Sequence, residues 1–276
     1  MKNKYRSFLK WAGGKYRLID HIRQHLPEGD RLVEPFVGAG SVFLNTDFDR
    51  YLLNDINPDL IHLYKCIQKK PIKYIKDAKE LFTPEYNRKE AYYEIRNEFN
   101  QLKPGNKRRA VLFLYLNRHG YNGLCRYNNS GGFNVPFGKN NRPYFPEEEL
   151  AFFAEKSQKA TFVCKDFVSI FKEIAGDDTV YCDPPYIPLS KTSYFTSYAS
   201  GGFTIEQQQL LAQLAHDVSL NKGANVLLSN HATEWTKEAY NQACITKIVP
   251  VGRAISQNGQ NRRSVEEILA LYKSKC

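Results

Sequence analysis

Short apolar runs alternate with helical patterns along most of this 276-residue chain, and this alternation limits its possible folds more than any other feature. Five runs are typical of buried strands because they are apolar and end at turn-forming residues. They cover Arg31–Phe36, Tyr51–Asn54, Ala160–Cys164, Thr179–Cys182 and Ala224–Ser229. Helical patterns, such as Ile205–Leu220, lie between them. The alternation predicts an α/β fold, a mostly parallel sheet covered by helices.

A helical block interrupts this alternation after the second predicted strand. Helices are predicted over Pro58–Gln68, Ile72–Phe82, Lys89–Leu102 and Lys107–Asn117. A Gly/Asn/Pro-rich stretch, Arg118–Pro146, then reads as a long loop with room for one hairpin, and loops of that length are usually functional. We predict that residues 58–144 form an inserted domain and that residues 1–57 and 145–276 form the main domain. The C-terminal pattern RRSVEEILALYK fits a helix or a strand.

The positive charge of the chain is concentrated in this block. The formal net charge is +10, and residues 99–146 contain no Asp or Glu. The basic residues of this stretch are Lys103, Lys107, Arg108, Arg109, Arg118, Arg126, Lys139 and Arg142. Asn and aromatic residues are interleaved with them, which favours nucleic acid, since cations bind phosphates, amides bind base edges and rings stack on bases. A solvated basic surface is the alternative.

Several classes of protein do not fit the sequence. The longest purely apolar and aromatic run, Ala110–Leu116, is far shorter than the ~20 residues that span a membrane. The N-terminus has no apolar segment of a secretory signal. The six cysteines form no CxxC pair, so we expect reduced thiols, no metal site and a cytoplasmic location.

The segment FVGAGSVF, Phe36 to Phe43, places two glycines between a predicted strand and a predicted helix. Glycines here let a ligand approach the backbone at the carboxyl end of the strand. Asp55, after the next predicted strand, could accept hydrogen bonds from ribose hydroxyls. The dinucleotide-binding pattern needs a third glycine at position 43, where Phe43 stands, so a nucleoside site is favoured. A purely structural turn is the alternative.

The segment VYCDPPY places Asp183 directly after an apolar strand and before two prolines. Prolines fix the backbone and lack N–H groups, so carbonyl oxygens of their turn have no local donor. A carboxylate and a fixed carbonyl can together accept both N–H groups of one amino group. The ring of Tyr186 offers a stacking face for a planar base. A rigid loop without chemistry is the weaker alternative.

These motifs, in this order, resemble the Dam-type DNA adenine methyltransferases over nearly the whole chain. The matching segments are KWAGGK, FVGAG, the acid after the second strand, Asp166-Phe167 and DPPY, and the most specific is the loop NRHGYNGLCRYN…FNVPFG. The resemblance implies a Rossmann-like methyltransferase sheet with helices on both faces and a mostly helical, inserted DNA-recognition domain. It implies that residues 1–57 and 145–276 bind S-adenosyl-L-methionine and catalyse methyl transfer.

The resemblance also implies a role for individual residues. Asp183, Pro184 and Tyr186 would be catalytic. The methyl donor would contact Trp11, Lys15, Phe36, Gly38, Gly40, Asp55, Asp166, Phe167 and Asp183. DNA contacts would come from Lys10, Tyr121, Asn122, Leu124, Arg126, Pro136 and Lys139, with Tyr121 and Asn122 entering the duplex. Close relatives carry an aromatic residue two positions after the last glycine of the loop, where this chain has Asn140-Asn141.

The implied activity is transfer of the sulfonium methyl to the 6-amino nitrogen of a flipped-out adenine in double-stranded GATC. We expect a solitary monomeric enzyme that serves strand marking for mismatch repair, replication control and gene regulation. A cytosine 4-amino DNA methyltransferase is the nearest alternative, since the same acceptors suit either amino group. A non-catalytic nucleic-acid-binding protein is a second alternative.

Overall fold

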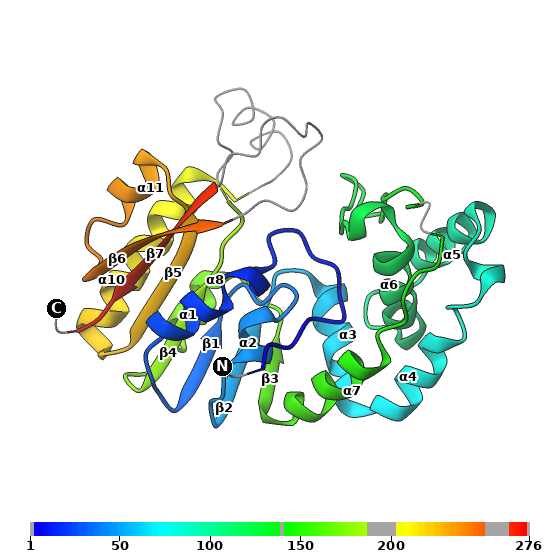
Figure 1. The fold of residues 1–276 in the computed structure, drawn as a ribbon, viewed down its shortest axis with the longest axis horizontal. Helices are drawn as coiled ribbons and strands as arrows, with labels where there is room; N and C mark the ends of the chain where they lie inside the picture. Colours follow the sequence, from blue (N-terminus) through cyan, green and yellow to red (C-terminus); the bar gives the residue numbers. More distant parts are fainter. Residues whose placement is uncertain (1–2, 139–140, 187–202, 252–264, 275–276) are drawn as a thin grey trace. The chain divides into compact units, whose positions relative to one another are not determined.

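The computed structural model describes residues 3–138, 141–186, 203–251 and 265–274 (Figure 1). The chain divides into two compact units. The first unit contains residues 1–16, 37–45 and 55–164, and the second contains residues 17–36, 46–54 and 165–276. The boundaries predicted for the insert stay a prediction.

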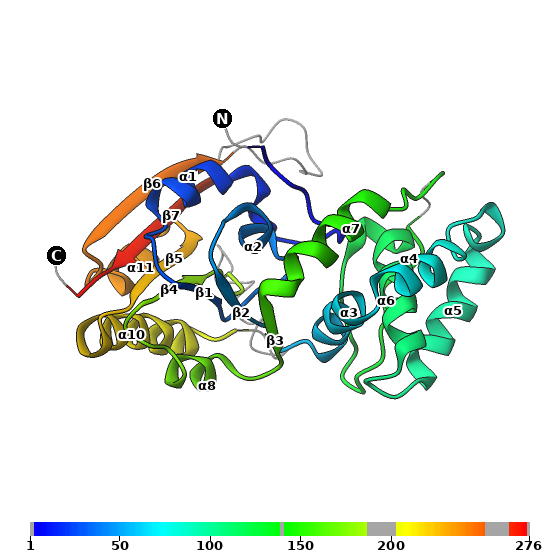
Figure 2. The same ribbon diagram turned by 90° about the horizontal axis from the view of Figure 1, so that it is seen from below.

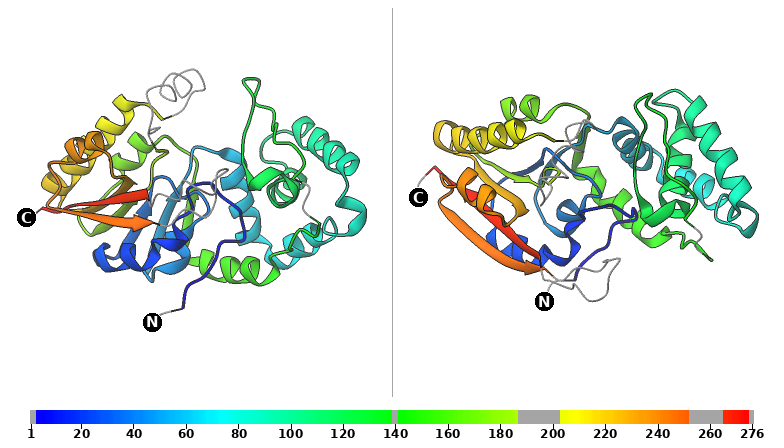
Figure 3. Two further views of the ribbon diagram at one scale, coloured as in Figure 1. Left: turned by 45° about the horizontal axis from the view of Figure 1, so that its top comes forward. Right: turned by 90° about the horizontal axis from the view of Figure 1, so that it is seen from above.

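A seven-stranded sheet has the strand order β3-β2-β1-β4-β5-β7-β6. The strands are β1 (Arg31–Glu34), β2 (Arg50–Asn54), β3 (Ala160–Val163), β4 (Asp178–Cys182), β5 (Asn225–His231), β6 (Ile245–Val251) and β7 (Val265–Tyr272). β1 pairs in parallel with β2 and β4, and β4 pairs in parallel with β5. β7 pairs antiparallel with β5 and β6, and Figure 3 shows β6 and β7 side by side. The predicted α/β class is confirmed.

Helices cover both faces of the strands in the second unit. Figure 2 shows α1 (Ile19–His25) on one face and α8 (Phe167–Lys172) and α10 (Ile205–Lys222) on the other. α10 begins with a capping box, in which the side chains of Thr204 and Gln207 bond each other's backbone N–H, and ends at Gly223 with φ of +80°. Such caps satisfy N–H and C=O groups that a helix leaves open. α11 (Glu234–Ala239) follows β5.

The register of β1, β2 and β4 brings their carboxyl ends to one edge of the sheet. Glu34 of β1 pairs with Leu53 of β2, and Val33 pairs with Val180 of β4. The polar segments singled out from the sequence come directly after these strands. Because ligands of open α/β sheets bind beyond the carboxyl ends of the strands, this register marks the candidate site.

The first unit is mostly helical. It contains α2 (Ser41–Asn45), α3 (Pro58–Lys69), α4 (Pro71–Lys79), α5 (Lys89–Gln101), α6 (Lys107–His119) and α7 (Glu147–Lys156). Short 3-10 turns cover Lys15–Arg17, Pro84–Tyr86, Tyr121–Gly123 and Ser157–Lys159. Aromatic rings form part of its core: Phe153 lies 5.0 Å from Phe8, 5.8 Å from Phe43 and 4.7 Å from Tyr64 between centroids. Buried rings of this size supply much of the apolar area that stabilises a domain.

A buried ion pair joins two helices of the first unit. The guanidinium of Arg109 on α6 donates to both carboxylate oxygens of Asp59 on α3, at 2.6 and 2.7 Å. Arg109 also donates to the carbonyls of Phe99 and Leu102. The hydroxyl of Tyr127 donates to Asp59 at 2.8 Å. A buried charge pair is stable only when further hydrogen bonds satisfy its remaining donors and acceptors, and the bonds to Phe99, Leu102 and Tyr127 do so for this pair.

The expectation that all cysteines are reduced is wrong at one position. Cys66, Cys125, Cys164 and Cys182 are free, whereas Cys244 is disulfide-bonded. Cys276 lies outside the described residues. In the described part of the chain, no helix combines the length and apolarity needed to cross a membrane.

Candidate functional site

The glycine turn after β1 packs against the N-terminal segment. Gly38 and Gly40 have φ of +47° and +70°, a region that side chains disfavour. A Cβ on Gly38 would lie only 3.0 Å from the indole nitrogen of Trp11. The structure thus places Trp11 next to Gly38, and both residues are predicted to bind the same ligand.

Asp55, directly after β2, accepts hydrogen bonds from two backbone N–H groups. Its Oδ2 accepts from Gly38 at 3.0 Å, and its Oδ1 accepts from Asn57 at 2.9 Å. Burial raises the pKa of Asp55, and the two N–H bonds act against this rise. Each oxygen keeps a second lone pair, which suits a ligand hydroxyl or ammonium.

Lys15 is buried, and its ammonium donates to the carbonyl of Gly13 at 2.8 Å. Gly13 has φ of +76°, so the turn WAGGK bends back over its own lysine. The structure therefore holds the Lys15 cation beside the backbone of the turn that carries Trp11.

In the second unit, aromatic rings gather beyond β1. The centroid of Phe36 lies 5.6 Å from that of Phe167 and 5.5 Å from that of Phe203. Asp166 is the N-cap of α8, with Oδ1 accepting from the N–H of Ser169 and Oδ2 from its hydroxyl. These bonds lower the pKa of Asp166, the side-chain bond most. The sequence analysis did not predict Phe203 as part of this cluster, because it is far from Phe36 and Phe167 in the sequence.

The turn Asp183–Tyr186 follows β4 and is held by residues of neighbouring elements. The hydroxyl of Ser229 on β5 donates to Asp183 at 3.4 Å. The buried amide of Gln208 on α10 donates to the carbonyl of Pro185 at 2.7 Å. Within the described ranges, no group donates to the carbonyl of Pro184. The carbonyl of Pro184 therefore keeps its lone pairs within the described part of the chain, directly after Asp183 in the sequence.

The ring of Tyr186 is fixed by two residues that the sequence did not reveal. Its hydroxyl donates to Oε2 of Glu267 at 2.8 Å. The ring of His231 lies 4.2 Å from its centroid, at 64° between the planes. Burial and then the charge of Asp183 raise the pKa of Tyr186. Tyr186 therefore stays protonated and offers its ring, with the hydroxyl already bonded.

The predicted recognition loop belongs to the first unit. Isolated antiparallel bridges pair Gly120 with Phe137 and Tyr127 with Phe133, in place of a regular hairpin. Two residues of α5 hold the second half of the loop. The side chain of Asn100 bonds both the N–H and the C=O of Phe133, and the hydroxyl of Tyr92 donates to the carbonyl of Val135. A scaffold of helices thus presents the loop.

Lys10 lies against this loop. Its backbone N–H and C=O both bond the side chain of Asn117, whose amide also donates to the carbonyl of Gly123. Gly123 has φ of +64°, and a Cβ on it would lie 2.2 Å from Cβ of Lys10. Burial first, and then the charge of Arg118, lower the pKa of Lys10. The structure brings Lys10 to the turn that bears Tyr121 and Asn122.

The tip of this turn is exposed and its backbone is unusual. Tyr121 is 44% exposed, and its N–H donates to the carbonyl of Pro136. Asn122 has φ of +52°, the one positive φ of a non-glycine residue in the described part of the chain. Asparagine is one of the few residues besides glycine that adopt this region, so Asn122 sets the shape of the turn. Lys139 lies outside the described residues.

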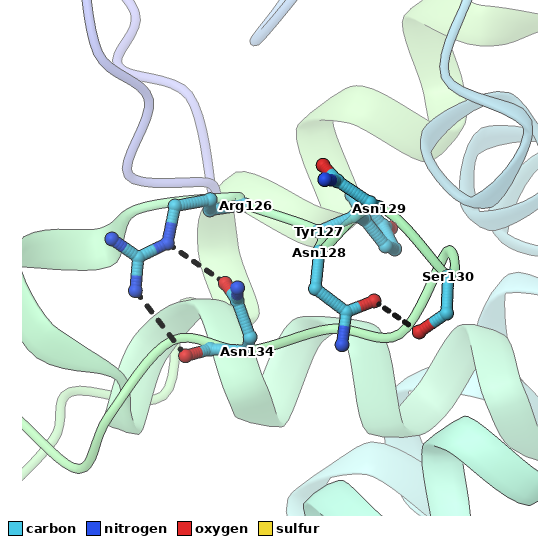
Figure 4. A pocket seen from close by; sticks show the side chains of 6 residues that line it. All are labelled: Arg126, Tyr127, Asn128, Asn129, Ser130 and Asn134. Atoms are coloured by element: carbon cyan, nitrogen blue, oxygen red, sulfur yellow. Dashed lines mark hydrogen bonds between the residues drawn. The ribbon is translucent and has the colours of Figure 1, made fainter. Parts of the chain in front are cut away.

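Polar residues form an open hollow beside Arg126 (Figure 4). It is lined by Arg126, Tyr127, Asn128, Asn129, Ser130 and Asn134. Arg126 donates to the side-chain oxygen of Asn134 at 2.7 Å and to its carbonyl at 3.4 Å. The oxygen of Asn128 accepts from Gly132 and Ser130 and thereby closes the tip of the loop. The arrangement offers amides and one guanidinium, the groups that bind phosphates and base edges.

The chain is similar to known proteins along almost its whole length. Residues 11–255 match the family of D12 class N6 adenine-specific DNA methyltransferases. The chain is 56% identical over 270 residues to a DNA adenine methylase of Escherichia coli, covering 98% of this chain and 96% of that protein. It is 55% identical over 269 residues to a DNA adenine methylase of Vibrio cholerae, with the same coverage. A DNA adenine methylase of Serratia marcescens is 55% identical over 271 residues, covering 98% and 99%.

Proposed function

Because the chain belongs to the D12 class family of N6 adenine-specific DNA methyltransferases, we propose that it methylates adenine in double-stranded GATC sites with S-adenosyl-L-methionine. The chain is a DNA adenine methyltransferase. The site sequence, the flipping of the base and the individual residue roles are parts of the proposal. The observation that carries it is the turn in which Asp183 stands beside a proline carbonyl to which no described residue donates.

The residues present suit the methyl donor. Asp55 keeps acceptor lone pairs for hydroxyl or ammonium groups. Gly38 and Gly40 carry no side chain at the turn after β1, and the indole of Trp11 lies next to Gly38. Phe36 and Phe167 offer ring surface for an adenine. When bound, the donor supplies an activated methyl group on a sulfonium centre. We assign its binding to Trp11, Lys15, Phe36, Gly38, Gly40, Asp55, Asp166, Phe167 and Asp183.

Asp183 and the carbonyl of Pro184 would accept the two N–H groups of the target amino nitrogen. That nitrogen is a poor nucleophile because its lone pair is delocalised into the ring. Accepting both hydrogens favours a more tetrahedral nitrogen with a localised lone pair. The bonds strengthen as positive charge grows on the nitrogen, so they stabilise the transition state more than the ground state. Tyr186 would stack on the base and keep its amino group aligned.

A base within a duplex cannot reach such a turn, so the adenine must rotate out of the helix. We propose that Tyr121 and Asn122 occupy the space it leaves, because Tyr121 is exposed at the tip of a turn that Asn122 shapes. Lys10, Leu124, Arg126 and Pro136 would read the remaining bases, and Lys139 would contact the DNA. The proposed biological roles are strand marking for mismatch repair, replication control and gene regulation, carried out by a monomer.

The test is transfer of labelled methyl from S-adenosylmethionine to a GATC duplex. We expect Asp183→Ala to lower kcat at least about 100-fold, the effect of removing one group that stabilises developing charge. Asp177→Ala is the matched control, because Asp177 is exposed in the loop before the same strand. Undiminished transfer by Asp183→Ala would contradict the assignment. Nucleoside analysis of the product separates 6-methyladenine from 4-methylcytosine.

A further inference from the structure

The catalytic turn ends in Tyr186, whose ring is fixed from outside the turn. Its hydroxyl donates to Glu267 at 2.8 Å, and His231 packs against the ring at 4.2 Å. Glu267 and His231 lie 36 positions apart in the sequence, and no pattern there assigned either of them to the site.

Glu267 and His231 are direct cross-strand partners. The register of β5 and β7 pairs His231 with Glu267, so their side chains project from the same face of the sheet. On its other side, β7 pairs Glu267 with Val249 of β6. The backbone of Glu267 is therefore held by strands on both sides.

Glu267 is only 8% exposed. A buried carboxylate is costly without a hydrogen-bond donor, and the hydroxyl of Tyr186 is such a donor. Because the carboxylate oxygen accepts, the hydroxyl proton points toward Glu267. The hydroxyl proton is thus used within the protein, and the ring supplies the flat surface for contact with a ligand.

We propose that Glu267 is a positioning residue, which, with His231 packed against the ring, fixes the plane of Tyr186 for stacking on the target adenine. This inference rests on the proposed function, because it requires a base to stack on Tyr186. Without Glu267 the ring can rotate about its side-chain torsions, and a stacked base then samples orientations in which the amino nitrogen is out of line. Loss of alignment lowers the rate of the chemical step with little change in binding.

The experiment compares Glu267→Gln, Tyr186→Phe and the double variant with wild type. Tyr186→Phe deletes only the hydroxyl, and Glu267→Gln replaces the charged acceptor with a neutral one. We expect kcat to fall about tenfold in Tyr186→Phe and about threefold in Glu267→Gln, since a hydrogen bond to a charged group is stronger than a neutral one. KM for the duplex and for the donor should stay within about twofold. In the double variant, kcat should equal that of Tyr186→Phe, because both changes act on one bond.

Glu266→Gln is the matched control, since it removes the same charge at the neighbouring, exposed position of β7 and should behave as wild type. A duplex with 2-aminopurine at the target adenine reports stacking directly. Fluorescence of the bound complex should be higher in Glu267→Gln and Tyr186→Phe than in wild type or Glu266→Gln, because a loosely stacked base is quenched less. Thermal unfolding of each variant separates this effect from loss of folded protein.

Wild-type kcat and fluorescence in Glu267→Gln and Tyr186→Phe would overturn the inference. So would multiplicative losses in the double variant, or equal losses in Glu266→Gln. If Glu267→Gln does not fold, Tyr186→Phe decides alone, through the split between kcat and KM and through the fluorescence. Failure of wild type to methylate any duplex would instead contradict the proposed function. An active wild type with unaffected variants contradicts only the role of Glu267.

Discussion

The side-chain amide of Asn57 donates a hydrogen bond to Sγ of Cys125, 3.4 Å away. Asn57 also donates its backbone N–H to Asp55 and caps α3 by accepting from the N–H groups of Asp59 and Leu60. Burial raises the pKa of Cys125 to about 12, so the thiol stays neutral and serves as a packing and hydrogen-bonding group. One asparagine thus contacts both the proposed donor-binding acid and the segment of the recognition loop.

We expect Asn57→Ser to weaken sequence discrimination. Serine retains an acceptor for the helix cap but cannot reach Cys125 as a donor. The segment around Arg126 should then be held less firmly, and the ratio of methylation at GATC to that at one-base variants should fall about threefold, as expected for loss of one modest hydrogen bond. Asn106→Ser is the control, because Asn106 caps α6 by the same kind of bond. Equal ratios in the two variants would contradict the role of Asn57.

Arg126→Ala should relax the choice of base at an outer pair of GATC. An arginine fork suits guanine, and such a contact contributes ~1–3 kcal/mol of discrimination. In the structure the guanidinium bonds Asn134, which orients it at the edge of the loop. The measurement is kcat/KM on duplexes with one base pair changed at a time. Uniformly weaker binding with unchanged preference would show that Arg126 contacts phosphate alone.

Asp59→Asn should destabilise the protein by ~3 kcal/mol, because it leaves the buried guanidinium of Arg109 without its counter-charge. Glu98→Gln tests the neighbouring pair with Arg108, which is exposed on both sides, and should change stability by less than about 1 kcal/mol. Urea unfolding at neutral pH measures both. Similar losses in the two variants would mean that burial of the pair is unimportant.

His119 makes stability depend on pH. Burial lowers its pKa to about 4, and no described residue bonds its Nε2. Above the pKa of ~6.5 that the ring has in the unfolded chain, it is neutral in both the folded and the unfolded protein. Its titration therefore takes nothing from the free energy of unfolding at such pH values. As the pH falls from ~6.5 toward 4, the unfolded chain binds the proton first and stability is lost.

The magnitude is set by the width of this interval. At pH 5 the loss amounts to ~2 kcal/mol, since each pH unit between the two pKa values contributes ~1.4 kcal/mol. His119→Phe keeps a ring against Tyr115, which stacks on His119 at 4.0 Å, and removes the titration. Comparing urea unfolding at pH 7.5 and pH 5 in both proteins isolates this contribution. A variant with the same pH dependence as wild type would rule His119 out as its source.

The alternating strands and the polar residues after them were predictable because local patterns encode them. β1, β2, β4 and β5 are short apolar runs, and Asp55 and Asp183 come directly after two of them. β6 was not predicted, because Pro250 and Lys247 break its pattern, which an edge strand tolerates. The pattern VEEILALY fitted a helix as well as a strand, and the structure shows a strand, β7. β7 lies between two neighbouring strands and is buried on both faces, so its sequence lacks the alternation of apolar and polar residues that marks a half-exposed strand.

The residues that support the site could not be found in this way. Gln208 reads as one polar position of a helix, and Glu267 as one charge in an ambiguous segment. Only the pairing of β5 with β7 and the packing of α10 bring them to the turn after β4. Their position depends on how segments that are distant in the sequence pair and pack, and no single stretch of sequence carries this information.

The absent side chain of Gly123, beside Lys10, has a consequence for engineering new target sequences. The two positions are separated by more than a hundred residues, yet any substituent on the glycine would overlap the lysine stem. A chimera that receives only the recognition loop of another enzyme would lack the N-terminal segment that packs against that loop. Specificity cassettes should therefore be exchanged together with the N-terminal arm, as one discontinuous module.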